Sequence, residues 1–290
     1  MRIRATVAAV SGVLALSTLA VPAAHADGSS YQEEAVAALA DSRGPSERSA
    51  FSTAAVIGDL DVSFSNFKMA KAVKVGTTNH VSTTVTYKIT HGADVNIKSQ
   101  DFATGPYIYK GSYDAPVNLL LGIAPATCTA TSSTTANCTG KVDIYPGDGE
   151  LINSDAGTWK GGALALNYST EEFADEGGLG TILVQRYSKL TVNASPEPVK
   201  KGKTITVTGK LSRANWETGK YAGYTNQSVK LQYRKKSSTT YTTLKTIKTN
   251  STGELKTTVT ASADGYYRYS FAGTTTTPAV NAAGDFVDVQ

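Results

Sequence analysis

Apolar and polar side chains alternate one by one along several short segments of this chain. Between Val81 and Thr90 the odd positions are apolar or β-branched, while the even positions are serine, threonine or lysine. The same alternation recurs over residues 204–211 and 229–234. A period of two residues places the two sets of side chains on opposite faces of a β-strand. Each segment is therefore predicted to be a strand with one buried face.

Turn signals such as Ser251-Thr252-Gly253 and Asp264-Gly265 separate further short runs of this kind. Early strands are predicted near residues 59–67, 80–90, 93–99, 106–110, 125–130, 136–145, 158–168 and 181–188. Later strands are predicted near residues 203–211, 228–235, 240–248, 254–261, 266–272 and 284–289. The segment 193–203 carries two prolines, so we expect a connection or a first edge strand there. Six or seven short strands in about 100 residues indicate a β-sandwich of immunoglobulin-like type.

The predicted fold class is therefore all-β, with two β-sandwich (Ig-like) domains in tandem. We expect the first domain at residues 51–188 and the second at residues 189–290, since the chain is long enough for two cores. One helix is predicted from Tyr31, with Ala35, Val36, Leu39 and Ala40 on one side and Gly44-Pro45 ending it. We expect residues 27–50 to form a helical, loosely attached arm.

The N-terminus has the layout of a secretory signal peptide. Arg2 and Arg4 precede an apolar run from Ala5 to Val21, which Ala24-His25-Ala26 follows. Residues 1–26 are therefore predicted to be a signal peptide, cleaved after Ala26. No later segment approaches 18 consecutive apolar residues, so no membrane span is expected in the mature chain. The predicted location is extracellular, either secreted or associated with the cell wall.

The chain has two cysteines, Cys128 and Cys138, with nine small or polar residues between them. This spacing is not the C-x-x-C of a thioredoxin-type site. A structural zinc ion would need four ligands, and besides the cysteines the mature chain offers only His80 and His91. Because exported cysteines tend to oxidise, the pair is predicted to form a disulfide across a β-hairpin. A functional thiol is the alternative.

The last hundred residues resemble a known family. The segments KKGKTITVTGKLSRANW, VKLQYRKK, DGYYRYSFAG and GDFVDV are similar to the bacterial Ig-like modules that end many secreted actinobacterial proteins. The resemblance implies an Ig-like fold over residues 190–290. Such modules serve as spacers, adhesins, and carbohydrate or wall binders, so it does not imply an activity. Residues 51–188, with HGADVNI and SDAGTWKGGALAL, resemble the N-terminal part of proteins with the same ending, some of which are labelled calcium-binding.

Charge differs sharply between the two predicted domains. Residues 27–188 contain 11 Lys and Arg against 18 Asp and Glu, whereas residues 189–290 contain 15 against 6. Many of the C-terminal basic residues alternate with apolar ones, so we expect one exposed basic sheet face that attracts extracellular polyanions such as cell-wall polymers. Its predicted members are Lys210, Lys230, Arg234, Lys235, Lys245, Lys248 and Lys256. The alternative is a solvated face that keeps the sheet soluble and protects its edges.

Aromatic residues of the same domain suggest a second kind of binding. In DGYYRYSF, Tyr267, Tyr269 and Phe271 share one parity and should face the core, which leaves Tyr266 and Arg268 outward. A platform for a sugar ring is predicted from Trp216, Tyr221, Tyr224 and Tyr266, with capping of the core as the alternative. No OB, RRM or other module signature accompanies these rings, so no dedicated nucleic-acid partner is expected.

Two acidic loops raise the prospect of calcium, which takes six to eight oxygen ligands. The candidate ligands are Asp148, Glu150, Asp155, Glu171, Glu172, Asp175 and Glu176. Neither loop fits the EF-hand pattern, and solvated acidic loops are the alternative. No other cofactor is expected.

Recognisable catalytic machinery is missing from the sequence. There is no G-x-S-x-G, no H-E-x-x-H and no phosphate-binding glycine loop. His80 and His91 are an odd number of residues apart in one predicted strand, so they should point to opposite faces. The sequence therefore predicts a non-catalytic binding or structural protein. A calcium-binding extracellular module is the first alternative, and a carbohydrate-binding protein or polysaccharide hydrolase is the second, because a glycosidase needs only two carboxylates.

Overall fold

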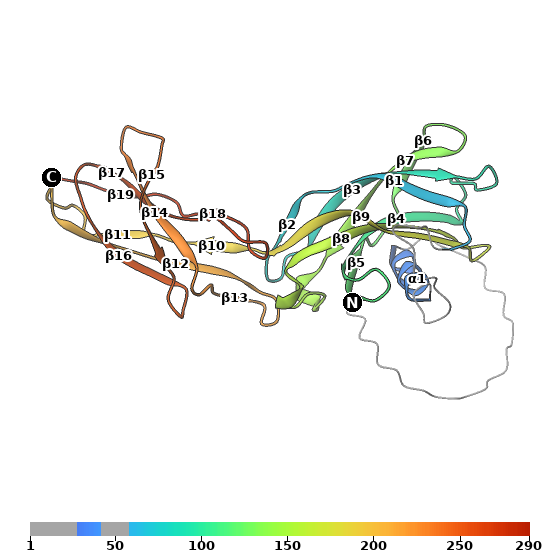
Figure 1. Ribbon diagram of the computed structural model, residues 1–290, viewed down its shortest axis with the longest axis horizontal. Coiled ribbons are helices and arrows are strands. Elements are labelled where there is room, and N and C mark those ends of the chain that lie inside the picture. The colour runs from blue at the N-terminus through green and yellow to red at the C-terminus, as the bar shows by residue number, and fades with distance from the viewer. Residues whose placement is uncertain (1–27, 42–57) are drawn as a thin grey trace, which may run out of the picture. The chain divides into compact units, whose positions relative to one another are not determined.

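The computed structural model describes residues 28–41 and 58–290, which form a nearly all-β structure (Figure 1). The predicted signal peptide and its cleavage site lie outside the described residues. The elements up to residue 190 are α1 (Gly28–Asp41), β1 (Val62–Lys68), β2 (Ala72–Val75), β3 (Val81–His91), β4 (Phe102–Gly111), β5 (Pro116–Leu121), β6 (Thr127–Ala130), β7 (Thr135–Ile144), η1 (Pro146–Asp148), η2 (Asn153–Asp155), β8 (Gly157–Asn167), β9 (Phe173–Arg186) and β10 (Ser188–Leu190). The later elements are β11 (Asn193–Ser195), β12 (Thr204–Asn215), β13 (Lys220–Gly223), β14 (Ser228–Lys235), β15 (Thr242–Lys248), β16 (Glu254–Thr260), β17 (Gly265–Phe271), β18 (Val280–Asn281) and β19 (Asp285–Val287).

The chain divides into two compact units, as many as the domains predicted. The first unit comprises the described residues before Ala72 together with Val81–Ile144 and Trp159–Ile182. The second comprises Ala72–His80, Tyr145–Thr158 and Leu183–Gln290. Compared with the predicted boundaries, the second unit therefore gains two short segments from the middle of the predicted first domain and its last six residues, Leu183–Ser188.

The first unit contains two sheets. One has the order β1-β3-β7-β6, and the other has the order β2-β9-β8-β4-β5, of which β2, the last residues of β9 and the first two residues of β8 belong to the second unit. Val85, Tyr87 and Ile89 of β3 are buried, as the alternating sequence predicts. The Tyr87 hydroxyl lies 2.9 Å from Thr104 Oγ1 of β4, so a hydrogen bond joins the two sheets in the interior. The prediction of a β-sandwich is confirmed.

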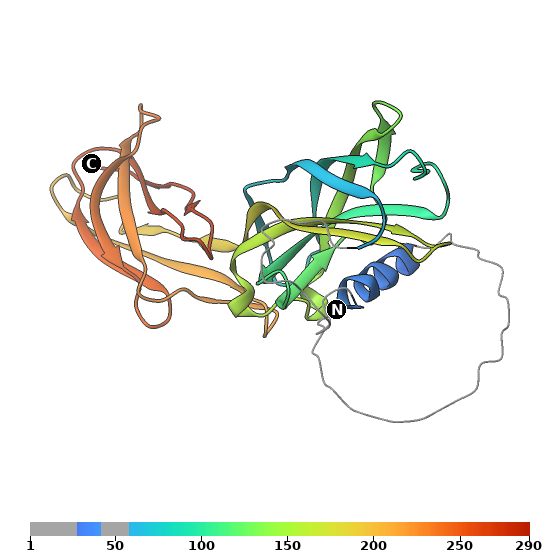
Figure 2. The ribbon, with the colours of Figure 1, turned by 45° about the vertical axis from the view of Figure 1, so that its right-hand side comes forward.

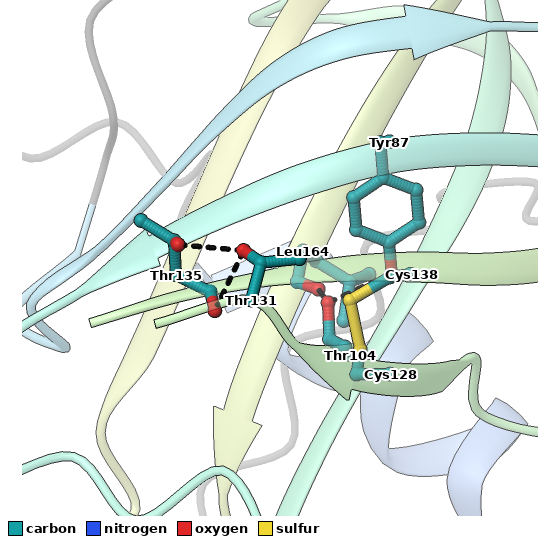
Figure 3. The surroundings of a disulfide bond; sticks show 7 residues. All are labelled: Tyr87, Thr104, Cys128, Thr131, Thr135, Cys138 and Leu164. Atoms are coloured by element: carbon teal, nitrogen blue, oxygen red, sulfur yellow. Dashed lines mark hydrogen bonds between the residues drawn. A yellow bond between two sulfur atoms is a disulfide. The ribbon is translucent and has the colours of Figure 1, made fainter. Parts of the chain in front are cut away.

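The predicted disulfide is present between β6 and β7 (Figure 3). Cys128 and Cys138 lie directly opposite each other in the antiparallel register, and their sulfur atoms are 1.98 Å apart. Cys138 is buried and pairs on its other side with Tyr87 of β3. At the hairpin tip, hydrogen bonds join the side chain of Thr131 to Thr135. The bridge therefore fastens the largely exposed edge strand β6 to the core of the first unit.

Helix α1 packs onto the sheet of the first unit (Figure 2). Tyr31, Ala35 and Leu39 repeat every four residues and are all buried, in a cluster that includes Tyr107 of β4. A Cβ atom at Gly105 of β4 would collide with the Tyr31 hydroxyl, so glycine is required at this close approach. The helix was predicted correctly, but its description as a loosely attached arm is wrong.

The outward side of α1 also differs from the expectation. Ala40, expected on the buried side, is exposed, because the buried stripe follows Tyr31, Ala35 and Leu39 rather than the neighbouring positions.

α1 has 14 residues, and within the described ranges no helix has the length and apolar character that a membrane span requires.

The second unit is also a sandwich of two sheets. In one, β12 pairs with β10, β11, β13 and β16; in the other, the order is β15-β14-β17-β18, with β19 also on β17. The core between them includes Ile205, Val207, Leu211, Val229, Leu231, Tyr267, Tyr269 and Phe271. The inward positions of the three β17 residues are confirmed. The prolines of segment 193–203 follow β11, which is the short edge strand considered for this segment.

Some strand predictions were wrong. Residues 93–99 form turns instead of a strand, since Asn96 Oδ1 accepts the Lys98 N–H at 3.1 Å and Val95 N–H reaches the carbonyl of Gly92. Strands β2, β5, β10, β13 and β18 were missed because they are short and lack a sustained alternation. β9 begins at Phe173, eight residues before the predicted strand, because its first residues, FADEGG, lack the apolar alternation that marks a strand in sequence, although Asp175 and Glu176 are buried there.

Candidate functional site

The outward side of the sheet β15-β14-β17 carries basic and aromatic side chains in alternation. In the register between β14 and β17, Lys230 pairs with Ser270, Gln232 with Arg268, and Arg234 with Tyr266. Their neighbours in each strand, such as Leu231 and Tyr269, point into the core. We define the basic-aromatic face as Lys230, Arg234, Tyr241, Tyr266, Arg268 and Phe286.

Stacking holds the two arginines of this face in place. The Arg234 guanidinium lies 3.8 Å from the centre of the Tyr266 ring, and the Arg268 guanidinium lies 3.8 Å from the centre of the Tyr241 ring. Tyr266 in turn contacts Phe286 at 5.2 Å between ring centres. Such stacks restrict a guanidinium while leaving its edge available for hydrogen bonds.

Neutral partners orient each guanidinium further. Arg268 Nε donates to Gln232 Oε1 at 2.9 Å, and one Nη of Arg234 donates to the carbonyl of Ser238 at 2.7 Å. Across the part of the chain that the structure describes, neither arginine forms an ion pair. The face therefore presents two oriented, uncompensated positive charges beside aromatic rings, an arrangement that suits anionic groups carried on a larger molecule.

The predicted polyanion residues do not form one face. Lys230 and Arg234 lie on the basic-aromatic face, and Lys248, which pairs with Ser228, lies on the same sheet. Lys210 and Lys256 belong to the opposite sheet, in β12 and β16. The prediction of a single basic sheet face is therefore wrong, because the lysines alternate along strands of both sheets, whose outer sides face in different directions.

Lys245 and Lys235 also depart from the predicted face. Lys245 pairs with the inward-pointing Leu231, and its Nζ donates to the carbonyl of Thr258 at 2.7 Å. Lys235 ends β14 opposite Gly265, where it is exposed. The pairing of β15 with β14 shifts at a bulge between Leu231 and Gln232. A strict alternation of inward and outward residues along β15 therefore assigns Lys245 to the wrong side of the sheet.

Three of the predicted lysines line a hollow of about 610 Å³ in the second unit. Lys210, Lys248 and Lys256 surround it together with Glu254. Hydrogen bonds from Asn250 lower the pKa of Glu254, and the nearby positive charge of Lys210 lowers it further. The hollow thus holds its own anion, which makes it a less suitable site for an acidic ligand than the basic-aromatic face.

The predicted sugar platform is not assembled. Trp216 is buried, and its Nε1 donates to the carbonyl of Gly76 at 2.8 Å. Tyr221 is covered by Lys189, whose Nζ lies 3.7 Å from its ring centre, and Tyr224 lies under Arg213. Tyr266 belongs to the other sheet. The prediction is wrong for Trp216 because its ring is buried and its indole N–H is used by the backbone of Gly76.

The acidic residues of the loop 145–158 hold backbone groups. Glu150 Oε2 accepts the N–H of Tyr145 at 2.6 Å, and Asp155 Oδ2 accepts the N–H of Ile152 at 2.7 Å. Both carboxylates are buried, whereas Asp148 in η1 is exposed. These bonds fix two tight turns, which is a structural use of the carboxylates.

The acidic residues of the second predicted loop are divided between the surface and the interior, since Asp175 and Glu176 lie in β9 instead of a loop. Glu171 is exposed and Glu172 accepts from the Thr170 hydroxyl at 2.8 Å. Asp175 accepts from the Tyr107 hydroxyl at 2.5 Å. Burial raises the pKa of Glu176, although the Phe64 N–H that it accepts acts in the other direction. Within residues 28–41 and 58–290, no group of three or more His, Cys, Asp or Glu side chains is placed to hold a metal ion, and calcium binding stays a prediction.

The two histidines have separate environments. His80 precedes β3 and stacks on Tyr145, with 4.3 Å between ring centres. His91 ends β3, is buried, and has its Nδ1 2.8 Å from the carbonyl oxygen of Gly92.

A cluster that sequence reasoning missed surrounds Arg186 and Arg213 in the second unit. Arg186 Nε donates to the carbonyl of Ala214 at 2.6 Å. One Nη of Arg213 donates to the Thr277 hydroxyl at 3.0 Å, and its guanidinium lies 3.8 Å from the centre of the Tyr224 ring. No signal in the sequence pairs these residues, because Thr277 is 64 positions from Arg213 and 91 from Arg186.

Comparisons with known proteins show only weak similarity. No protein-family model and no curated protein matches the chain. Among solved structures, a marsupial T cell receptor is 14% identical with a TM-score of 0.35, covering 77% of this chain and 72% of that one. The fibronectin(III)-like modules of CbhA from Clostridium thermocellum are 10% identical with a TM-score of 0.27, covering 79% and 92%. The D0-D1 domain of intimin is 16% identical with a TM-score of 0.25, covering 77% and 98%. At these TM-scores the matches add nothing to the architecture already described.

Proposed function

We propose that the protein is a secreted, non-catalytic binding protein that associates with extracellular polyanions, such as cell-wall polymers, through the basic-aromatic face. One observation carries this proposal: the stacked arginines Arg234 and Arg268 lie on one sheet face beside Lys230 and have no carboxylate partner in the described chain. Preoriented guanidinium groups favour phosphate and carboxylate over neutral ligands. The excess of positive charge in residues 189–290 would add long-range attraction.

The secreted location rests on the sequence of residues 1–26, and the absence of recognisable catalytic motifs supports a role in binding. Two buried carboxylates of the acidic loops, Glu150 and Asp155, hold backbone N–H groups. Their structural use favours polyanion binding over the calcium-binding and hydrolase alternatives.

The proposal is tested by co-sedimentation of the purified protein with Gram-positive cell walls at increasing salt. We expect the wild type to pellet at low salt and to be released as salt rises, because salt screens exposed charges. The R234Q/R268Q variant should bind much more weakly. The matched control is K200Q/K201Q, which removes the same charge from exposed lysines outside the face.

The comparison of the two variants separates a specific face from net charge. Equal losses in both variants would mean that only total charge matters, and the proposed face would be wrong. If the wild type fails to pellet at any salt concentration, cell-wall binding itself is refuted.

A further inference from the structure

Arg186 is a buried cation with little to compensate it. Only 7% of its surface is exposed, and the single acceptor of its side chain is the Ala214 carbonyl, bound to Nε. In the described residues, the two Nη groups of Arg186 have no hydrogen-bond acceptor. Because neither Nη is among the fully enclosed side-chain atoms of the described residues, both donors stay open to an incoming ligand, and a charge largely withdrawn from water favours an anionic one.

Arg213 adds a second positive charge to the same place. It lies in β12 opposite Ser188, two residues after Arg186. Both guanidinium groups have a lowered pKa: burial lowers that of Arg186 to about 10, with Arg213 contributing as well, and burial lowers that of Arg213. Because each positive charge destabilises the other, one anion between them would stabilise the pair more than it would stabilise either arginine alone.

Glu217, the carboxylate whose charge acts on Arg186, does not supply that anion. The charge of Glu217 reaches Arg186, but its Oε2 accepts from Asn153 Nδ2 at 2.7 Å and its Oε1 from the Asn153 N–H at 3.4 Å. Neither arginine has a carboxylate within ion-pair distance anywhere in residues 28–41 and 58–290. Both positive charges are therefore available to an anionic ligand.

The surroundings keep the second arginine oriented. The Tyr224 ring lies against the Arg213 guanidinium, and the hydroxyls of Thr276 and Thr277 accept from its Nη at 3.4 and 3.0 Å. The backbone N–H of Arg186 donates to the carbonyl of Thr276 at 3.0 Å, so one loop contacts both arginines. Planar forks held in this way suit an oxyanion with several oxygen atoms.

We propose that Arg186 and Arg213 bind a phosphate group. Two guanidinium groups offer more N–H donors than the two oxygen atoms of a carboxylate can accept, whereas a phosphate group presents four oxygen atoms around one centre. The phosphate comes either from a free small molecule or from a phosphodiester of a polymer. This inference is independent of the proposed function, since β12 and the end of β9 are not part of the basic-aromatic face.

The test is isothermal titration calorimetry of the purified full chain with sodium phosphate, sodium acetate and sodium chloride at equal ionic strength, supported by thermal melting. We expect saturable binding of phosphate, weaker binding of acetate and none of chloride. Titration with glycerol phosphate and with a glycerol phosphodiester then distinguishes the sources, because tighter binding of the diester indicates a polymer.

Variants locate the binding. R213Q should weaken phosphate binding roughly tenfold or more, since it removes a charged donor pair. K220Q is the matched control, because Lys220 is an exposed cation of the neighbouring strand β13, and it should bind as the wild type does. R213K retains the positive charge but not the paired N–H donors of the guanidinium, so its affinity for phosphate should lie between those of the wild type and R213Q. It also provides a test if R213Q does not fold. Equal heats for phosphate and chloride, or unchanged affinity in R213Q or R213K, would overturn the proposal.

Discussion

Lys245 Nζ donates a hydrogen bond to the main-chain oxygen of Thr258, and so links edge strand β15 of one sheet to β16 of the other in the second unit. An inward-pointing lysine on an edge strand is a known protection against pairing with another chain. Substituting Lys245 by alanine should lower the free energy of unfolding by about 0.5 kcal/mol, because the bond is exposed to water.

The larger effect expected of K245A is self-association at high protein concentration, since both strand edges lose their charged cover. Sedimentation velocity measures it. K203A removes an exposed lysine that precedes β12 and should remain as monodisperse as the wild type. If K203A associates to the same extent, loss of charge rather than the edge explains the result.

Removing the disulfide should destabilise the first unit alone. The C128A/C138A variant loses a short loop closure, which is worth about 3 kcal/mol in the chain-entropy model. The chain has two tryptophans, of which the buried Trp159 lies in the first unit and the buried Trp216 in the second. Urea unfolding followed by fluorescence in W216F and W159F backgrounds therefore reports each unit separately.

We expect the Trp159 signal to shift to lower urea in the disulfide variant while the Trp216 signal stays in place. A shift of the Trp216 transition by the same amount would show that the two units unfold together, and the assignment of the disulfide to the stability of one unit would be wrong.

The alternation of apolar and polar residues correctly predicted the strands that bury one face along their whole length. Val85, Tyr87 and Ile89 in β3, and Tyr267, Tyr269 and Phe271 in β17, lie where their parity places them. The alternation misplaces Lys245, because the bulge in the pairing of β15 with β14 leaves no mark in the sequence of β15.

Sites were harder to predict than strands because their contacts join residues that are far apart in the chain. Arg234 and Tyr266 were each singled out for a different reason, and only the register of β14 with β17 brings them together. Trp216 fills the interior instead of the surface, and Asp175 binds the Tyr107 hydroxyl, 68 positions away. Local sequence carries no information about such partners.

The docking of α1 is tested by substituting Leu39, which is 2% exposed, with alanine. Deleting a buried leucine side chain costs about 2–5 kcal/mol, so the Trp159 transition should move to clearly lower urea. A40Q is the control, because Ala40 is exposed on the same helix and glutamine is a good helix former. Comparable losses in L39A and A40Q, or none in L39A, would contradict the buried stripe described for this helix.

Alkaline pH should destabilise the second unit through its buried tyrosines. Burial, together with the nearby Tyr233, raises the pKa of Tyr267 to about 12 from its ordinary value of 10.0. Because the folded state holds this proton more tightly than the unfolded state, its contribution is complete below pH 10 and is lost as the pH rises toward 12. The Trp216 transition should therefore move to lower urea between pH 10 and 12. In Y267F that movement should be smaller, and Y266F, which changes a half-buried tyrosine on the outer face, should behave as the wild type does. An equal pH dependence in Y267F and the wild type would show that Tyr267 does not carry the effect.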